Sequence, residues 1–220
     1  MMRYKAVLLD AFGTILQIKA VKHPYRQLLK EGIRNGRCPK PEDAQFLMTF
    51  NGELPQAAEH LGIDVHPSRL AEIAETLEQE VSSIEAFPDA LEAVALLHER
   101  KLLLAVCSNL AFPYGRAVRK LFPNLDAFGF SYEIGTTKPD PLMYSATCKL
   151  IGVELSSIFG ENRIIMVGDS LRCDCYGPCA VGITGIYLDR SKATGINDLM
   201  HLARHVLSES QQHCNDVSER

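Results

Sequence analysis

The sequence has little excess charge of either sign. Its 220 residues carry 23 basic and 27 acidic side chains, a formal net charge of −4. Proteins that bind nucleic acid or an anionic membrane surface through charge have a strongly basic face or a basic overall composition. The composition gives no electrostatic basis for either partner, so we expect no binding to nucleic acid or membranes.

Long apolar runs are also absent. No stretch reaches the roughly 18 apolar residues that a membrane-spanning helix needs. The first apolar run, residues 6–9, ends at Asp10 and is too short for the core of a signal peptide. Seven cysteines are an odd number for a disulfide framework. Without a secretion signal they predict reduced thiols in a cytoplasmic protein.

The sequence does contain short apolar runs that alternate with helical segments. Runs of this kind are typical of strands, and the strongest are typical of strands buried on both faces. They lie at residues 6–9, 102–107, 128–132, 164–167 and 185–188. Helical segments lie at residues 89–100, 116–121, 141–151, 174–181 and 197–207, followed by a polar tail that we expect to be frayed. The alternation predicts an α/β fold with a doubly wound, Rossmann-like parallel sheet.

Residues 16–86 interrupt this alternation. Apolar side chains recur there at helical spacing, and no part alternates as a strand would. The clearest helix follows Ser68, a suitable N-cap, and has an apolar stripe from Leu70 to Ile84 with glutamates on its other face. We expect a bundle of about four helices, inserted into an α/β core made of residues 1–15 and 87–220.

Polar residues follow several predicted strands at the point where each strand ends. Asp10 follows the first strand, Ser108 and Asn109 follow the second, and Asp169 follows the fourth. Lys138 lies in a loop just before Pro139. Open α/β sheets bind ligands beyond the carboxyl ends of their strands. We therefore expect these side chains to meet in one crevice.

The side chains of this crevice have complementary chemistry. Asp10 is suited to be a nucleophile or a metal ligand. Ser108 and Asn109 can hydrogen-bond to an oxyanion or a phosphate, and Lys138 can neutralise an anionic group. Asp169 and Asp174 add hard oxygen ligands of the kind that Mg²⁺ takes in proteins.

Four motifs in this order resemble those of the haloacid dehalogenase (HAD) superfamily of hydrolases. Asp10 to Thr14 is similar to its first motif, Asp-x-Asp-Gly-Thr, with the second Asp replaced. Ser108-Asn109, Lys138-Pro139 and the segment from Gly168 to Asp174 resemble the second, third and fourth motifs. The resemblance runs from residue 5 to about 190, and the helical insert is similar to the family's helical cap domain.

The resemblance implies a Mg²⁺ site and a role for each motif. Asp10 would be the nucleophile, and Asp10, the main-chain carbonyl of Phe12 and Asp169 would hold Mg²⁺. Asp174 would support the water shell of the metal or the lysine. Ser108 would bind the transferred phosphoryl group, and Lys138 would stabilise its charge. The implied activity is hydrolysis of a small, anionic, phosphorylated metabolite.

Phe12 departs from the phosphatases of this family. They have at this position an Asp that protonates the leaving group and then activates water, which a Phe cannot do. Loss of such a group typically costs about 10²–10⁴ in rate. Asp-Ala-aromatic-Gly-Thr is instead similar to the 2-haloacid dehalogenases, which displace halide without a metal and have a modified fourth motif. The phosphonoacetaldehyde hydrolases also lack the second Asp, but they need a lysine of the cap.

Three hypotheses therefore remain open from the sequence: a Mg²⁺-dependent hydrolase of phosphorylated compounds, a hydrolase of carbon–halogen bonds, and a catalytically silent relative that binds a ligand or partner. Substrate contacts are expected from Phe12, from Asn109 and from Arg26 near the start of the insert. The run Cys173, Cys175 and Cys179 lacks the second pair that structural zinc sites usually have, and we interpret it as packing.

Overall fold

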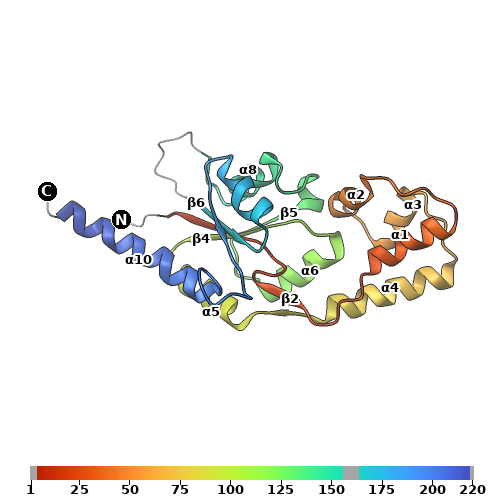
Figure 1. Ribbon diagram of the computed structural model, residues 1–220, viewed down its shortest axis with the longest axis horizontal. Helices are drawn as coiled ribbons and strands as arrows, with labels where there is room; N and C mark the ends of the chain where they lie inside the picture. The colour runs from red at the N-terminus through yellow and green to blue at the C-terminus, as the bar shows by residue number, and fades with distance from the viewer. Residues whose placement is uncertain (1–3, 156–163, 219–220) are drawn as a thin grey trace.

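The computed structural model describes residues 4–155 and 164–218, with side chains up to Ser208 in the last helix. Figure 1 shows a sheet in the middle of an elongated molecule, the helices of the insert at one end and the last helix at the other. The remaining residues of the expected core, 1–3, 156–163 and 219–220, lie outside the described residues. No helix in the described part of the chain has the length and apolar character needed to cross a membrane.

The central sheet is parallel throughout, which confirms the predicted fold class. Its five strands have the order β5-β4-β1-β6-β7. They are β1 (Ala6–Leu9), β4 (Leu103–Ser108), β5 (Ala127–Phe130), β6 (Ile164–Gly168) and β7 (Thr184–Tyr187). Leu9, the last residue of β1, pairs with Val106 on one side and with Val167 on the other. The central position of β1 therefore places its carboxyl end between those of β4 and β6.

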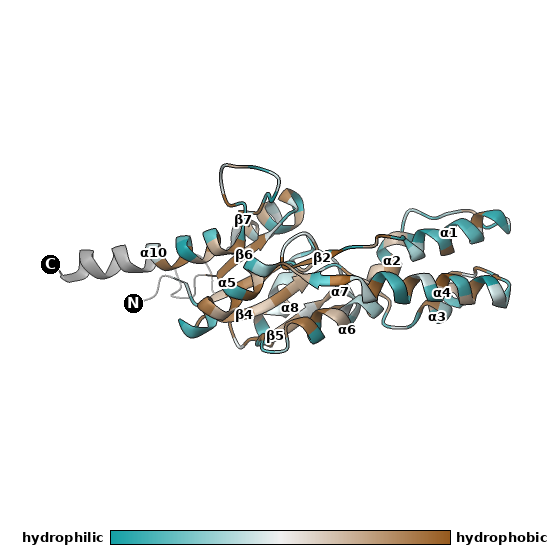
Figure 2. Cartoon of the chain, turned by 90° about the horizontal axis from the view of Figure 1, so that it is seen from below, coloured by the Kyte–Doolittle hydropathy of each residue, from teal (hydrophilic) through white to brown (hydrophobic). Residues whose placement is uncertain are grey.

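Helices cover both faces of this sheet. They are α5 (Pro88–Glu99), α6 (Phe112–Leu121), α7 (Ser131–Ile134), α8 (Pro141–Leu150), the π-helical turn η1 (Leu171–Tyr176), α9 (Gly177–Cys179) and α10 (Leu199–Ser218). Successive residues of a strand point to opposite faces. Val7 and Leu9 accordingly pack with α5, α6 and α10, whereas Ala6 and Leu8 pack with α8. The apolar strands lie at the centre of the molecule in Figure 2.

Several predicted boundaries in the core were wrong. Tyr132 belongs to the short helix α7 and not to β5. The helix expected at residues 174–181 begins earlier, at Leu171, as a π-helical turn and ends at Cys179. The tail after Ser208, expected to be frayed, continues α10 to Ser218. The helix expected at residues 89–100 is α5, which begins at Pro88 and ends at Glu99, and the Asp89 carboxylate in its first turn accepts a hydrogen bond from Arg190.

The insert contains four helices, as the periodicity predicted. They are α1 (Pro24–Arg34), α2 (Asp43–Thr49), α3 (Leu54–His60) and α4 (Pro67–Ser82). Helices α1 and α4 contain both apolar and polar residues, as the brown and teal parts of their ribbons show in Figure 2. The N-cap of α4 is His66 and not Ser68: the His66 ring accepts a hydrogen bond from the Ser68 main-chain N–H.

Two short strands connect the insert to the core, although none was expected between residues 16 and 86. They are β2 (Leu16–Ile18) and β3 (Ile84–Ala86), which pair in an antiparallel ladder. Three residues are too few for alternation to stand out in a sequence. Ile84 continued the apolar stripe of the preceding helix, but α4 ends at Ser82. The chain thus enters and leaves the insert side by side.

A buried ion pair fixes the loop between α1 and α2. Both terminal nitrogens of Arg37 donate to the Asp43 carboxylate at 2.6 Å. The main-chain N–H of Lys40 adds a third hydrogen bond to the same carboxylate. These contacts, chiefly those with Arg37, lower the pKa of Asp43 to about 2. Asp43 is therefore ionised at neutral pH.

We predict that Asp43→Asn lowers the free energy of unfolding at pH 7 by about 3 kcal/mol, because it leaves the Arg37 charge buried without its partner. A carboxylate with a lowered pKa stabilises the fold above its unfolded pKa, and this contribution is lost as pH falls towards the folded value. The difference between wild type and variant, measured by urea unfolding, should thus narrow between pH 5 and pH 3. The exposed neighbour Glu42 is the control, since Glu42→Gln should change stability by less than about 0.5 kcal/mol. Equal effects of both substitutions would contradict the assignment.

Candidate active site

The carboxyl ends of β1, β4 and β6 bring three segments together at one edge of the sheet. Asp10 directly follows β1, and its main-chain N–H donates to the carbonyl of Val167 in β6 at 2.9 Å. Ser108 is the last residue of β4 and is buried. Asp169 directly follows β6. These three residues, predicted to lie at strand ends, therefore occupy adjacent positions along the same edge.

A buried lysine links two of the carboxylates at this edge. Lys138 is 5% exposed, and its Nζ lies 2.8 Å from Asp10 Oδ1 and 2.6 Å from Asp174 Oδ1. Burial opposes the charged ammonium, but the two carboxylates outweigh burial and raise the pKa of Lys138. The lysine is thus a permanent cation that holds one oxygen of Asp10 and leaves Oδ2 outside this ion pair.

The Asn109 side chain fixes the main chain of this lysine. Asn109 Nδ2 donates to the Lys138 carbonyl at 2.9 Å, and the Lys138 N–H donates to Asn109 Oδ1 at 2.7 Å. Both polar atoms of the amide are therefore engaged with the loop before Pro139. The structure gives Asn109 a positioning contact to Lys138, while the substrate contact expected from the sequence stays a prediction.

Three carboxylates gather beside the lysine. One oxygen each from Asp10, Asp169 and Asp174 lie within 4.8 Å of one another. Partial burial, followed by the charges of Asp10 and Asp174, raises the pKa of Asp169 to about 6. The Asp174 carboxylate is fully buried and also accepts a hydrogen bond from the Ser170 N–H at 2.9 Å. Such a set of hard, closely spaced oxygens fits Mg²⁺ or another hard divalent cation.

Glycine at position 13 makes room for one of these carboxylates. Gly13 has φ +77°, and a Cβ atom there would lie 2.0 Å from Asp169 Oδ2. A side chain would thus be strained by the backbone conformation and would also displace Asp169. The Gly-Thr turn after β1 is therefore required for the approach of Asp10 and Asp169.

Phe12 lies between this polar cluster and the insert. Its ring packs edge to face against Tyr114 of α6, with ring centroids 5.8 Å apart. It also lines a cavity of about 460 Å³ between the core and helices α1, α2 and α4. The Phe12 side chain has no titratable group, and Arg26 and Asn109 line the same cavity.

The comparison with known families agrees with this geometry. A family model described as haloacid dehalogenase-like hydrolase matches residues 4–177, most of the chain. The chain belongs to this family of hydrolases. The HAD resemblance proposed from the four motifs is thereby confirmed.

Solved structures of HAD enzymes share the fold at low sequence identity. A HAD phosphatase from Thermococcus onnurineus aligns with a TM-score of 0.60 and 22% identity over 92% of this chain and 97% of its own. An L-2-haloacid dehalogenase from Xanthobacter autotrophicus gives 0.55 and 21%, over 86% and 79%. A HAD family enzyme from Bacteroides thetaiotaomicron, in complex with magnesium and inorganic phosphate, gives 0.55 and 18%, over 86% and 96%. No curated protein matched the sequence.

Glu80 is a residue of this HAD hydrolase that sequence reasoning missed. It is 3% exposed and accepts hydrogen bonds from the Tyr114 hydroxyl at 2.5 Å and from the main-chain N–H groups of Lys22 and His23. The glutamates of α4 were expected on the polar face. Glu80, however, follows Ile73 and Leu77 at intervals of seven and three residues, so it falls on the apolar stripe. That spacing was the available signal.

The cysteine run forms no metal site in the described part of the HAD chain, where the carboxylate cluster is the one group suited to an ion. Cys175 is buried, Cys179 is exposed, and half-buried Cys173 lies with its Sγ 3.6 Å from the Lys138 carbonyl. Cys175 and Cys173 thus agree with the predicted packing around the turn after β6, whereas exposed Cys179 does not. The cysteines with described side chains are all free thiols.

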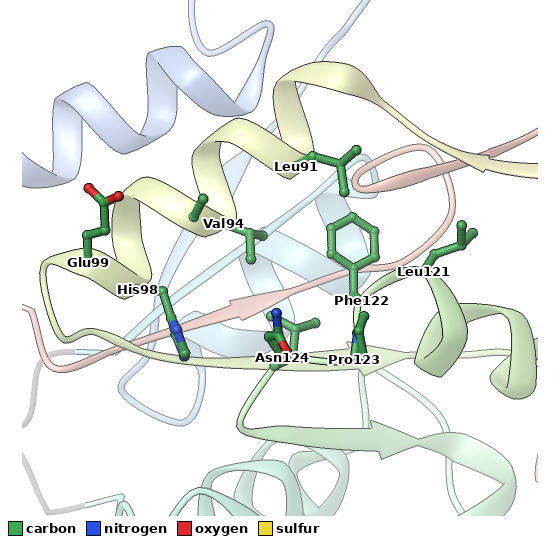
Figure 3. A pocket seen from close by; sticks show the side chains of 10 residues that line it. Leu91, Val94, His98, Glu99, Leu121, Phe122, Pro123 and Asn124 are labelled. Atoms are coloured by element: carbon green, nitrogen blue, oxygen red, sulfur yellow. The ribbon is translucent and has the colours of Figure 1, made fainter.

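A second cavity, of about 420 Å³, is separate from the HAD site. It lies between α5 and the segment after α6, where the ring of Phe122 points towards Leu91 (Figure 3). Asn124 and Leu125 in its wall come just before β5 begins at Ala127. This cavity is therefore near the amino end of that strand, at the opposite edge of the sheet from Asp10.

We predict that Asp10→Asn lowers the pKa of Asp169 below about 6, because it removes a neighbouring negative charge. The value should remain above 3.8, since partial burial, the largest cause of the shift, is unchanged. Carboxyl ¹³C shifts followed against pH in metal-free buffer measure it. Asp64→Asn, at an exposed position in the insert, should leave the Asp169 titration unaltered. An unchanged pKa in Asp10→Asn would show that the two carboxylates are not coupled.

Proposed function

We propose that this HAD hydrolase cleaves a small phosphorylated compound with Mg²⁺, using Asp10 as nucleophile, and that its substrates have leaving groups that need no proton. The observation that carries the proposal is the buried Lys138 that holds Asp10 beside Asp169 and Asp174 while Phe12 faces the adjoining cavity. The charged groups suit phosphoryl chemistry, and Phe12 limits which phosphates can react.

In this mechanism Asp10 Oδ2 attacks phosphorus while Lys138 holds Oδ1. The bond from phosphorus to the leaving oxygen breaks, and an aspartyl phosphate forms. Water then attacks the phosphorus, the bond from phosphorus to Asp10 Oδ2 breaks, the protons of the water leave with inorganic phosphate, and the Asp10 carboxylate is restored. Ser108 and Lys138 are the groups proposed to stabilise the phosphoryl oxygens in both steps.

Asp10, Asp169 and the main-chain carbonyl of Phe12 would hold Mg²⁺, and Asp174 would orient Lys138 or a water of the metal. When bound, Mg²⁺ supplies positive charge that offsets the repulsion between the carboxylates and the phosphoryl group. The complex of the Bacteroides thetaiotaomicron enzyme with magnesium and inorganic phosphate supports this assignment by analogy. The carboxylate spacing in this chain supports it independently.

The side chain of Phe12 has no proton to give to a departing oxygen. When the substrate is a phosphate ester of an ordinary alcohol, the leaving group is a strongly basic alkoxide, and its departure depends on such a proton. The leaving group of an acyl phosphate is a carboxylate and that of a phosphate anhydride is a phosphate. Both are weak bases and can leave without a proton. We therefore propose activated phosphates of this kind as the substrates, with exposed Arg26 attracting their charge at the mouth of the cavity.

Helices α1 to α4 are proposed to act as the cap of this enzyme, within an insert of residues 16–86. The cavity beside Phe12 has one wall from these helices and one from the core. The antiparallel pair β2 and β3 connects the two parts. The cap would thus limit the access of bulk solvent to the site and provide most contacts to the body of the substrate.

Carbon–halogen hydrolysis is a second candidate, and Phe12 is the observation that favours it. Halide leaves without a proton, and Asp10 could attack carbon in place of phosphorus. Asp169, which keeps a carboxylate at the metal position, favours phosphoryl transfer instead. The two reactions differ in their product and in their need for metal.

The test is an assay of the purified protein on acetyl phosphate and on 2-chloropropionate, each with MgCl₂ and with EDTA. We expect phosphate release that requires Mg²⁺ and is abolished in Asp10→Asn. Halide release in EDTA would replace the proposal by the second candidate. If neither substrate is hydrolysed but calorimetry still detects Mg²⁺ binding, the third hypothesis, a catalytically silent relative that binds a ligand or partner, would be favoured.

We predict that Phe12→Asp raises kcat/KM for an alkyl phosphate by about 10²–10⁴, because it restores a proton donor beside Asp10. The gain for acetyl phosphate should be much smaller, since its leaving group needs no proton. Phe12→Asn is the matched control, with nearly the same shape but no titratable group. Equal activity of the Asp and Asn variants on the alkyl phosphate would refute a role for proton transfer at position 12.

A further inference from the structure

The cavity beside Phe12 has a wall of aromatic rings and aliphatic side chains. Tyr114 packs edge to face on Phe12, and Tyr25 packs against Tyr114 with ring centroids 6.4 Å apart. Leu29 from α1 and Leu47 from α2 complete the wall on the insert side. The volume of about 460 Å³ lies within the range of small-molecule pockets.

Two polar side chains of this cavity, Glu80 and Asn109, are satisfied by the protein itself, whereas Arg26 and His23 in the same lining are exposed. Glu80 accepts from the Tyr114 hydroxyl and from two main-chain N–H groups. Asn109 uses both atoms of its amide on the main chain of Lys138. A substrate rich in hydroxyl groups would lose hydrogen bonds to water here and find few replacements, which costs binding energy.

We infer that this cavity selects substrates with an apolar body, an aromatic ring or a branched alkyl group, and discriminates against polyols such as sugar phosphates. The inference rests on the proposed function, because it takes Asp10 as the reacting group and Phe12 as the boundary between the reacting centre and the cavity. Phe12, Tyr25 and Leu29 are then specificity-determining residues, and burial of the apolar group drives binding.

The experiment compares probes that share a charged head and differ in their organic part. Phenylphosphonate and methylphosphonate are titrated into the wild-type protein with MgCl₂ by calorimetry, a readout that needs no turnover. We expect phenylphosphonate to bind about 30-fold more tightly, since it adds several buried carbons. Benzoyl phosphate should exceed acetyl phosphate in kcat/KM by a similar factor, mainly through KM, because both leave as weakly basic carboxylates.

Two cavity variants and one control test the location. Leu29→Gln and Met48→Gln place an amide in the cavity wall from α1 and from α2, and Met48 is partly exposed, so its replacement is compatible with folding. Each should reduce the preference for the phenyl probe at least about fivefold. Ile33→Gln changes an exposed residue one turn along α1, outside the cavity, and should keep the preference.

The outcomes separate this inference from the proposed function. Equal or absent binding of the two phosphonates would overturn the inference, as would a phenyl preference that persists in both cavity variants. Hydrolysis of acetyl and benzoyl phosphate at equal efficiency would leave the proposed function standing and remove the cavity assignment. Selective binding of phenylphosphonate without hydrolysis of either acyl phosphate would support the cavity and reject the reaction.

Discussion

The contact of one buried ammonium with two carboxylates is the interaction on which the site depends. Asp174 is fully buried, and an unpaired charge at such a position would be strongly unfavourable. Burial raises the pKa of Asp174 and the neighbouring Lys138 ammonium opposes that shift, while the two carboxylates keep the lysine charged. Removing the lysine would leave both carboxylates without this partner, and removing either carboxylate would leave the buried lysine with one partner in place of two.

This requirement is satisfied by segments far apart in the sequence. The order of the sheet places β1 between β4 and β6, so Asp10 lies next to the segments that carry Asn109 and Asp174. Asn109 then holds the loop of Lys138 by its main chain. On the other side of the Gly-Thr turn, Arg190 donates to the Thr14 carbonyl at 2.6 Å and pairs with Asp89. The segment from Asp10 to Thr14 is thus held both by the loop that carries Lys138 and by the loop after β7.

The sequence was sufficient for the features that depend on strong local patterns. Strands β1, β4 and β6 are apolar runs buried on both faces, and Asp10, Ser108 and Asp169 follow from where those runs end. The pairing of Asn109 with Lys138 could not be predicted in the same way, because it joins a side chain to a main chain 29 residues away. The strands β2 and β3 have only three residues each, too few for a pattern.

Glu80 shows a different limit of sequence reasoning. A glutamate is assigned to the solvent face of a helix by default, because burial of a carboxylate is costly without partners. Its partners here are the Tyr114 hydroxyl and two main-chain N–H groups at the start of the insert. His23, one of them, has a left-handed backbone conformation with φ 57°, which a bulky residue seldom adopts. The periodicity gave the position of Glu80 on the apolar stripe, whereas its partners depend on how the insert meets the core.

Phe12 affects both the proposed reaction and the proposed shape of the substrate. An aspartate at this position would supply a proton and would also introduce a charge at the edge of the cavity. A phenylalanine removes the proton donor and extends the wall formed by Tyr114 and Tyr25. The first consequence favours weakly basic leaving groups, and the second favours apolar ones. Aromatic acyl phosphates meet both conditions, so one replacement in the first motif would select the chemistry and the shape of the substrate together.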